Sequence, residues 1–246
     1  MSGALHLKRV RALHQRKYRE AGGLFLVQGR KMVAELQASG LRVEELYATP
    51  EAAAAMGHAG ARVLPAHDLA RMGTFAHGNE AVAVVRKPAV PQLELPVAGG
   101  FVLAVDEVAD PGNLGTLLRI ADWFGAGQLW CSAQSVEVWN PKCVQASMGS
   151  IFRVPVVYGD LAAALAQAAR QGVQVYKAEA SGTNVFEVQL QRPAVLVLGS
   201  ESHGLSQEVR EAPGRSIAVP AFGGAESLNV AAAAAALCME FARQGR

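Results

Sequence analysis

The sequence predicts an α/β protein with a small N-terminal α/β domain and a larger C-terminal domain built on a parallel sheet. Short apolar runs alternate with helical patterns along most of the chain. The run FVLAVDEV (residues 101–108) is almost continuously apolar, which is typical of a strand buried on both faces of a parallel sheet. The stretch RKPAVPQLELPVAGG (residues 86–100) carries Pro88, Pro91 and Pro96 and ends in two glycines, which indicates a linker.

We therefore expect one domain at residues 1–88, a linker at 89–100 and a second domain at 101–246. In the first, the pattern predicts helices at 5–20 and 31–40 and strands at 24–28, 43–48, 61–64 and 81–85. In the second, it predicts strands at 101–108, 128–132, 154–158, 173–179, 194–200 and 216–220. The helices expected between them lie at 113–126, 140–149 and 160–172, and an alanine-rich helix follows the last strand.

Composition favours a cytoplasmic protein with a sizeable core and no membrane segment. Of its 246 residues, 51% are hydrophobic, yet the longest apolar run (residues 230–239) is too short to span a bilayer. The N-terminus is charged and lacks the apolar segment of a signal peptide. The 3 cysteines have no CxxC spacing, which argues against a disulfide scaffold or a zinc site and fits a reducing compartment. We expect no metal.

Basic residues are concentrated at the N-terminus. Glu20 is the only acidic residue in the first 31 positions. Such an element on a mildly acidic body indicates a polyanionic partner, and a solvated helix face accounts for it about as well. The basic residues of this segment are Lys8, Arg9, Arg11, Arg16, Lys17, Arg19, Arg30 and Lys31.

Three polar loops follow predicted buried strands of the second domain. The first, DPGNLGTLLR, offers Asn113 as a helix cap and places Arg119 inside an apolar helix. That arginine either pairs with a carboxylate such as Asp106 or Asp122, or clamps a phosphate with its two-pronged guanidinium.

The second loop, GSESHGLS (residues 199–206), has a glutamate at the middle position of a nucleophile elbow, so it is not GxSxG. No GxGxxG occurs in the chain, which weakens a dinucleotide interpretation. Glu201 is either a functional carboxylate or a charge at a helix start, and His203 is expected to be an exposed or capping residue rather than an acid or base. The third loop leads into the cluster Glu226, Ser227 and Asn229 before the alanine helix. Ligands of parallel sheets lie beyond the carboxyl ends of the strands, so three such loops predict one pocket.

In this order the three stretches resemble the three signature motifs of the SpoU family, the TrmH-like RNA ribose 2′-O-methyltransferases of the SPOUT superfamily. The first resembles the family's Asn-x5-Arg motif, through Asn113 and Arg119. The second is similar to its lGsEgxGls motif, at residues 199–206, and the third to its P…eSLNV motif, at Pro220 and residues 226–230. The segment WNPKCVQASMGSIFRVPVV is also similar to a family stretch, and the ordered set of motifs is highly specific.

The resemblance implies a parallel sheet threaded into a deep trefoil knot, a homodimer formed through this domain, and S-adenosylmethionine as the methyl donor. The implied catalytic residues are Arg119, Asn113, Glu201, Ser227 and Asn229. The implied cofactor-binding residues are Leu198, Gly199, Ile217, Pro220 and Leu228, chiefly through their backbone. Because the donor carries an activated methyl group, no metal is implied. The alanine helix would then be small-sided because it packs tightly against threaded chain and a partner subunit.

The N-terminal stretch RKYREAGGLFLVQGRKMVAEL resembles the family's accessory RNA-binding domain, which is similar to ribosomal protein L30e. Its basic residues would then contact RNA phosphates. Here Gly78-Asn79-Glu80-Ala81 replaces the usual Pro-Gln-Gly, Gln28 stands where Glu is common, and Ala231 where Ser is often found. These departures bear on the RNA target. Ribosomal RNA is favoured over transfer RNA.

Two other classes of function stay open. One is a non-catalytic RNA-binding protein on the same fold, although such a protein would be expected to have lost Arg119, Glu201 or Asn229. The other is a dinucleotide-dependent oxidoreductase, which lacks its glycine fingerprint here. Binding of NAD against binding of S-adenosylmethionine separates the oxidoreductase from the methyltransferase.

Overall fold

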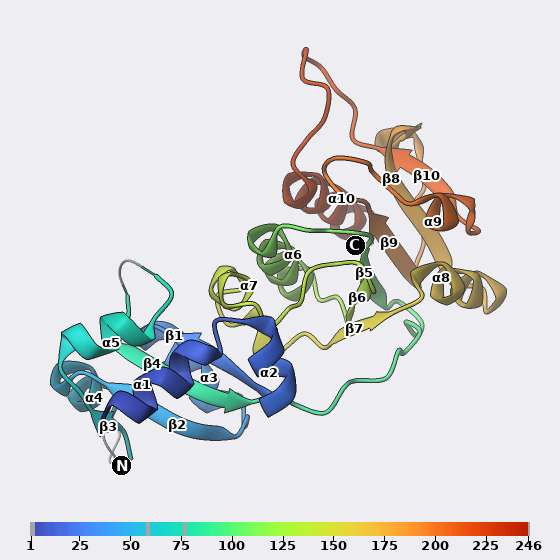
Figure 1. Cartoon of the computed structure of the whole chain (residues 1–246). Helices are drawn as coiled ribbons and strands as arrows, with labels where there is room; N and C mark the ends of the chain where they lie inside the picture. Colours follow the sequence, from blue (N-terminus) through green and yellow to red (C-terminus); the bar gives the residue numbers. More distant parts are fainter. Residues whose placement is uncertain (1–2, 58–59, 76–77, 246) are drawn as a thin grey trace. The chain divides into compact units, whose positions relative to one another are not determined.

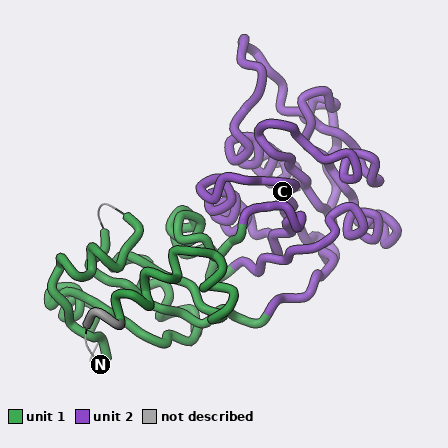
Figure 2. The backbone as a smooth tube through the Cα atoms, viewed as in Figure 1, with its two compact units in different colours: residues 1–89, 137–153 green, residues 90–136, 154–246 purple. Residues whose placement is uncertain are grey.

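The computed structural model describes residues 3–57, 60–75 and 78–245. The chain forms two compact units, shown in Figure 2. The N-terminal unit comprises residues 1–89 and 137–153, and the C-terminal unit comprises residues 90–136 and 154–246. The segment 137–153 thus groups with the N-terminal unit, whereas the sequence places it within the second domain.

The N-terminal unit is a four-stranded sheet with helices on both faces (Figure 1). The strand order is β1-β4-β2-β3, with β4 antiparallel to β1 and β2, and β3 parallel to β2. The strands are β1 (Leu24–Gln28), β2 (Val43–Ala48), β3 (Arg62–Val63) and β4 (Ala81–Arg86). The helices are α1 (Gly3–Ala12), α2 (Arg16–Gly22), α3 (Arg30–Ala38), α4 (Pro50–Met56), α5 (Ala66–Met72) and α7 (Pro141–Ala146).

An ion-pair cluster and apolar contacts hold segment 137–153 in this unit. Phe25 of β1 packs against Trp139, with ring centroids 4.4 Å apart. Glu137 accepts hydrogen bonds from Arg19 at 2.6 Å and from Lys87 at 2.9 Å. These partners lie far from the segment in sequence, so its membership of this unit follows from tertiary contacts alone.

The C-terminal unit is a six-stranded, wholly parallel sheet of order β10-β8-β9-β5-β6-β7. The strands are β5 (Phe101–Val105), β6 (Leu129–Ser132), β7 (Val156–Gly159), β8 (Gln174–Asn184), β9 (Ala194–Leu198) and β10 (Arg215–Ala218). The helices are α6 (Pro111–Trp123), α8 (Leu161–Arg170), α9 (Gln207–Glu211) and α10 (Val230–Gln244), with short 3-10 turns at Ser150–Phe152, in the N-terminal unit, and Val185–Glu187.

Both faces of the six-stranded sheet are covered, as the continuous apolar strands predict. On one face, Val102, Ala104 and Val197 join a core with residues of α8 and α9. On the other, Phe101 and Tyr176 pack against Phe241 of α10, with ring centroids 5.1 and 5.3 Å apart. Helices α6 and α10 contact each other on this second face (Figure 1).

Several predicted elements differ from the structure. The single helix predicted at residues 5–20 is wrong, because the chain turns at residues 13–15 and forms α1 and α2. At the turn, Leu13 and His14 bond three residues back, and His14 Nε2 lies 2.8 Å from the carbonyl of Met72. Helices α4, α5 and α9 are not predicted by the sequence pattern, because they have only 5–7 residues each and too few turns to set up a helical period.

Candidate active site

The carboxyl ends of β5, β9 and β10 carry the three polar loops, and all three loops meet in the C-terminal unit. The first begins α6, where Asp110 rather than Asn113 is the cap: Asp110 Oδ1 accepts from the Asn113 amide at 2.9 Å. The side chain of Asn113 is thereby free to face another loop. The prediction of Asn113 as the cap is wrong, because a cap three residues earlier sits directly before Pro111 at the first helical position.

A chain of side-chain hydrogen bonds joins the three loops. Asn113 Nδ2 donates to Glu201 Oε1 of the second loop. Asn229 Nδ2 of the third loop donates to Asn113 Oδ1 at 3.2 Å. Asn229 Oδ1 meanwhile accepts from the amides of Ala231 and Ala232 and caps α10. The polar residue before the alanine helix therefore both caps that helix and reaches the other motifs.

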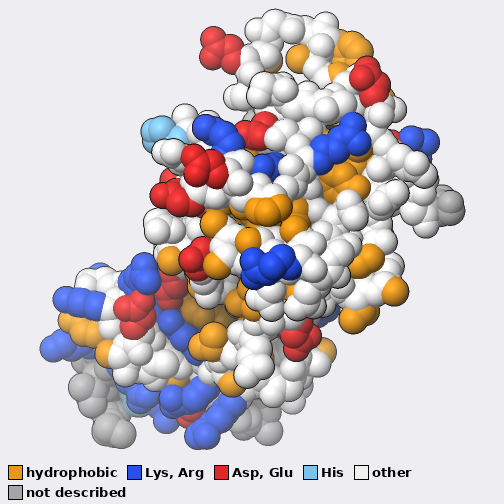
Figure 3. Space-filling model, turned by 90° about the vertical axis from the view of Figure 1, so that its right-hand side faces the viewer, with side chains coloured by type: hydrophobic (Ala, Val, Ile, Leu, Met, Phe, Trp, Pro, Cys, Tyr) orange, Lys and Arg blue, Asp and Glu red, His pale blue; other side chains and the backbone are white. Residues whose placement is uncertain are grey.

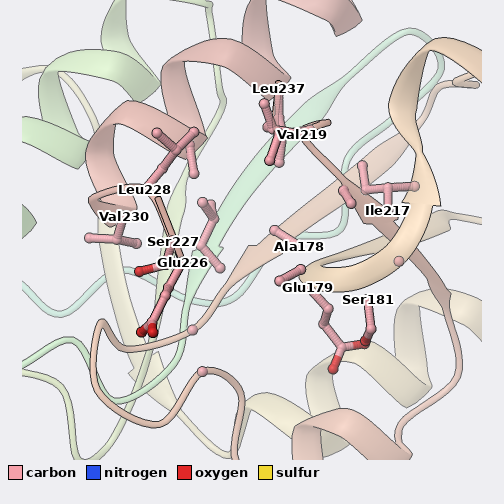
Figure 4. A pocket seen from close by; sticks show the side chains of 18 of the residues that line it. Ala178, Glu179, Ser181, Ile217, Val219, Glu226, Ser227, Leu228, Val230 and Leu237 are labelled. Carbon is pink, nitrogen blue, oxygen red and sulfur yellow. The ribbon is translucent and has the colours of Figure 1, made fainter. Parts of the chain in front are cut away.

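A cavity of about 1070 Å³ opens beside this chain (Figure 4). Figure 4 shows Glu226, Ser227 and Leu228 on one side of it and Ile217 and Glu179 on the other. All five residues predicted to hold the cofactor line it, together with the predicted catalytic residues Glu201 and Ser227. The five are Leu198, Gly199, Ile217, Pro220 and Leu228.

Three of the predicted catalytic residues do not line the cavity. Asn113 lies one hydrogen bond behind Glu201, and Asn229 lies two behind it. Arg119 lies further along α6, is exposed, and makes no hydrogen bond or ion pair to another residue in the described ranges. The ion pairs with Asp106 or Asp122 that the sequence left open are therefore not formed. Asp106 instead accepts from the amide of Ser206 at 2.8 Å and holds the second loop in place.

One wall of the cavity is not predicted by the sequence pattern. On β8, Lys177 pairs with Ser216 of β10, but the next pair is Thr183 with Ile217, so residues 178–182 bulge out and line the cavity. Glu179 in this bulge accepts from Arg210 Nε at 3.0 Å and from the Ser216 hydroxyl. In the sequence, Glu179 is a carboxylate at the very end of the predicted strand 173–179, a position similar to that of the other loop residues.

Burial lowers the reactivity of Cys131 and Cys238. All three cysteine side chains are buried and outside any disulfide. Burial raises the pKa of Cys131 and that of Cys238, the latter to about 12, so both remain thiols at neutral pH. No cluster of three or more His, Cys, Asp or Glu side chains suited to a metal ion occurs in the described ranges. No described helix combines the length and apolar character needed to cross a membrane.

Most of the basic residues predicted to bind RNA are exposed in the N-terminal unit, part of which is visible in Figure 3. Arg19 is the exception and a correction: it is 2% exposed, and its guanidinium bonds to Glu137 and to the carbonyls of Leu13 and His14. It therefore cannot face a phosphate. The exposed ones are Lys8, Arg9, Arg11, Arg16, Lys17, Arg30 and Lys31.

Known proteins resemble the chain over nearly its whole length. The model of the SpoU rRNA Methylase family matches residues 100–239, and the MRM3-like substrate binding domain matches residues 5–84. The 23S rRNA (guanosine(2553)-2′-O)-methyltransferase RlmP of Bacillus subtilis is 29% identical over 241 residues, which cover 94% of this chain and 93% of the relative.

Solved structures of other proteins also resemble the chain over nearly its whole length. A protein of the TrmH family from Porphyromonas gingivalis has a TM-score of 0.88 at 40% identity, with 99% of each chain covered. The SpoU methyltransferase AviRb from Streptomyces viridochromogenes, solved with AdoMet, has a TM-score of 0.86 at 28% identity, with 97% of each chain covered. With three ordered motifs joined by hydrogen bonds beside one cavity and a family match over more than half of its length, the chain belongs to the SpoU rRNA Methylase family.

Proposed function

We propose that this protein methylates a ribose 2′-hydroxyl of ribosomal RNA, with S-adenosylmethionine as methyl donor. The observation that carries the proposal is the Glu201–Asn113–Asn229 chain, which joins the three motif loops beside one cavity. The name of the Bacillus subtilis relative, a 23S rRNA 2′-O-methyltransferase, supports ribosomal RNA over transfer RNA. We place the protein in the cytoplasm, where its thiols stay reduced.

The cavity fits S-adenosylmethionine in size and chemistry. Its volume of about 1070 Å³ lies just above the range of roughly 300–1,000 Å³ that is usual for small-molecule sites. Leu198, Ile217 and Leu228 offer apolar surface for an adenine, and Gly199 and Pro220 border the same space. When bound there, S-adenosylmethionine supplies a methyl group activated by its sulfonium.

The side chains around the cavity then serve to orient the ribose. Asn113 and Glu201 are already oriented by their mutual hydrogen bond, and Asn229 fixes Asn113 from behind. Ser227 lines the cavity and can hold the surroundings of the 2′-hydroxyl. Positioning of this kind is the main demand of a transfer whose donor is already activated.

We assign Arg119 a role in stabilising negative charge rather than in transferring a proton. Its guanidinium keeps its proton in proteins, so it is a poor general base. We propose that it binds the phosphate next to the target ribose and stabilises the negative charge that develops on the 2′-oxygen. Its exposed position and lack of a partner in the described ranges leave it available for an RNA ligand.

We also propose a homodimer formed through the C-terminal unit, with the chain threaded as a trefoil knot. Trp123 of α6 is 83% exposed and Met239 of α10 is 58% exposed, and the two helices contact each other. Large apolar side chains of this kind on adjoining helices suit a subunit interface. Light scattering of the purified protein tests it: the mass of one chain in solution would rule the dimer out.

The experiment for the enzyme uses labelled S-adenosylmethionine with unmodified ribosomal RNA and, separately, transfer RNA. Wild type should label ribosomal RNA, and Arg119→Ala should lower the rate about 100-fold or more. Arg170→Ala, at an exposed arginine at the end of α8, is the matched control and should behave as wild type.

Each other outcome points elsewhere. Label in transfer RNA alone would make transfer RNA, and not ribosomal RNA, the substrate. Tight binding of S-adenosylmethionine without transfer to either RNA would favour the non-catalytic alternative. An unchanged rate in Arg119→Ala would remove that residue from the mechanism.

A further inference from the structure

The loop between β10 and α10 is held only at its ends. On one side Ile217 and Ala218 are buried in the sheet, and on the other Asn229 caps α10 and bonds to Asn113. Every residue from 221 to 229 is exposed, and residues 221–228 make no hydrogen bond to any part of the chain that the structure describes. A segment with firm ends and no internal bonds can change shape around a ligand at little cost.

Phe222 sits in this loop and is 90% exposed. It borders the same cavity as Leu228 and Ser227. The two residues that follow it are glycines, and a Cβ added at either would meet no atom within 4 Å. The ring thus contributes nothing to the core. The open space beside it can accommodate a planar ligand.

We propose that Phe222 stacks against a nucleobase of the RNA substrate, at or next to the nucleotide whose ribose is methylated. The inference rests on the proposed function. A ribose that enters the site brings its own base to within a few ångströms of the cavity mouth, where the loop lies. Unpaired RNA bases are commonly recognised by stacking on aromatic side chains, and every base offers a π-face.

A phenyl ring has no hydrogen-bonding group, so this contact holds a base without selecting which base it is. Phe222 is accordingly a positioning residue for the RNA, and the choice of target lies with other contacts. A competing role for the same ring is to cover the cofactor in the cavity. The two roles differ in which ligand loses affinity when the ring is removed.

The test compares Phe222→Ala, Phe222→Leu and Phe222→Trp with wild type. Affinity for unmodified 23S ribosomal RNA made by transcription in vitro is measured by filter binding at one salt concentration, and affinity for S-adenosylmethionine by calorimetry. Phe186→Ala is the matched control, because Phe186 is also exposed, at 62%, and does not line the cavity.

Stacking predicts that Phe222→Ala weakens RNA affinity by at least about fivefold, that Trp restores it, and that Leu does not. Affinity for S-adenosylmethionine and the thermal midpoint should stay at wild-type values, as should every property of Phe186→Ala. Wild-type RNA affinity in Phe222→Ala, full rescue by Leu, or a loss confined to S-adenosylmethionine would each overturn the stacking contact.

Failure of the proposed function would look different. Wild type that binds this RNA but transfers no methyl group to it would overturn ribosomal RNA methylation, while the affinities of the variants would still decide the role of Phe222. Wild type that neither binds nor methylates the RNA would overturn both.

Discussion

At the scale of single residues, Arg19 shows that a basic residue expected at the surface can instead be buried and stabilise the fold. It belongs to the basic N-terminal run, yet its guanidinium is buried against Glu137 and two carbonyls. A buried charge requires an opposite charge and satisfied donors, and segment 137–153 provides the carboxylate. Lys87 shares it at 2.9 Å, so one acidic residue holds two basic ones.

Glu137→Gln should lower the free energy of unfolding by about 3 kcal/mol at pH 7, because Arg19 would stay buried without an opposite charge. Chemical denaturation measures the loss. Glu20→Gln is the control: that carboxylate is exposed and pairs with Arg16, so its removal should cost about 0.5 kcal/mol or less. Equal effects of the two substitutions would contradict the assignment.

The effect of Glu137 should also depend on pH. Burial alone would raise the pKa of this carboxyl, but the hydrogen bonds from Arg19 and Lys87 outweigh it and hold the pKa below its usual range. A carboxyl group whose pKa is lowered by folding stabilises the folded protein at pH values above its unfolded pKa of about 4.3. This contribution is lost as the pH falls through the pKa of the folded state. The stability difference between wild type and Glu137→Gln should be constant above about pH 5.5 and shrink below about pH 4. A difference that stays constant down to pH 2 would argue against this ion pair.

At the scale of elements, the start of α10 combines two tasks in one side chain. Asn229 accepts from the first amides of the helix through Oδ1 and donates to Asn113 through Nδ2. An amide is suited to this because it carries an acceptor and a donor on the same group. The alanines that follow give a good helix former with little bulk, and Ala231 and Ala234 are buried.

Substitutions at Asn229 should separate the two tasks. Asn229→Asp keeps the acceptor that caps the helix but loses the donor, so stability should stay near wild type while methyl transfer falls about 10- to 100-fold. Asn229→Ala loses both, and should also cost about 1 kcal/mol of stability. Thermal unfolding and methyl-transfer rates measure the two effects. Full activity in Asn229→Asp would mean that the bond to Asn113 is not needed.

The second motif loop depends on a close approach that only glycine permits. A Cβ at Gly199 would lie 2.1 Å from the carbonyl carbon of Gly204, inside the pair of backbone bonds that joins Ser200 to Gly204. Gly199→Ala should therefore displace the loop and weaken S-adenosylmethionine binding about tenfold or more, as measured by calorimetry. Gly159→Ala, where a Cβ meets nothing within 4 Å, is the control. Equal affinities in the two variants would count against a cofactor site at this loop.

At the scale of the whole molecule, charge is unevenly spread over a chain that is close to neutral. The formal net charge is +2, yet α1, α2 and the start of α3 together hold seven exposed basic residues. Arg16 pairs with Glu20 at the surface, where such pairs are weak and a phosphate can compete for the arginine, whereas Arg9 pairs with Glu45, whose side chain is only 8% exposed. The distribution suits a unit that captures RNA while the other unit holds the reacting groups.

Charge reversal should show which unit binds the RNA. The double variant Arg11→Glu and Lys17→Glu should weaken RNA binding and lower the slope of log affinity against log salt by about 1–2, since each phosphate contact contributes roughly 0.7–0.9. Arg170→Glu with Arg215→Glu changes the net charge equally in the C-terminal unit and should have a smaller effect. Filter binding over a salt series measures both. Equal slopes would remove the N-terminal helices from the RNA interface.

The sequence by itself determined the α/β class, the three motif loops and the strands of both sheets to within a few residues, except that β8 continues to Asn184 beyond its predicted end at 179. It could do so because buried parallel strands read as apolar runs, and because polar residues after such strands belong to one edge of a sheet. The five residues assigned to the cofactor came from the resemblance, and the fold brings all five to one cavity.

The tertiary structure alone decided which polar groups meet. Asn113 bonds to Glu201 across 88 positions of the chain, Arg19 is buried by Glu137 across 118, and segment 137–153 joins the N-terminal unit. It also decided that Asp110 caps α6 and that residues 178–182 bulge from β8 to wall the cavity. Local patterns report the period and propensity of a segment, whereas pairing between distant side chains depends on packing that brings them within hydrogen-bonding distance.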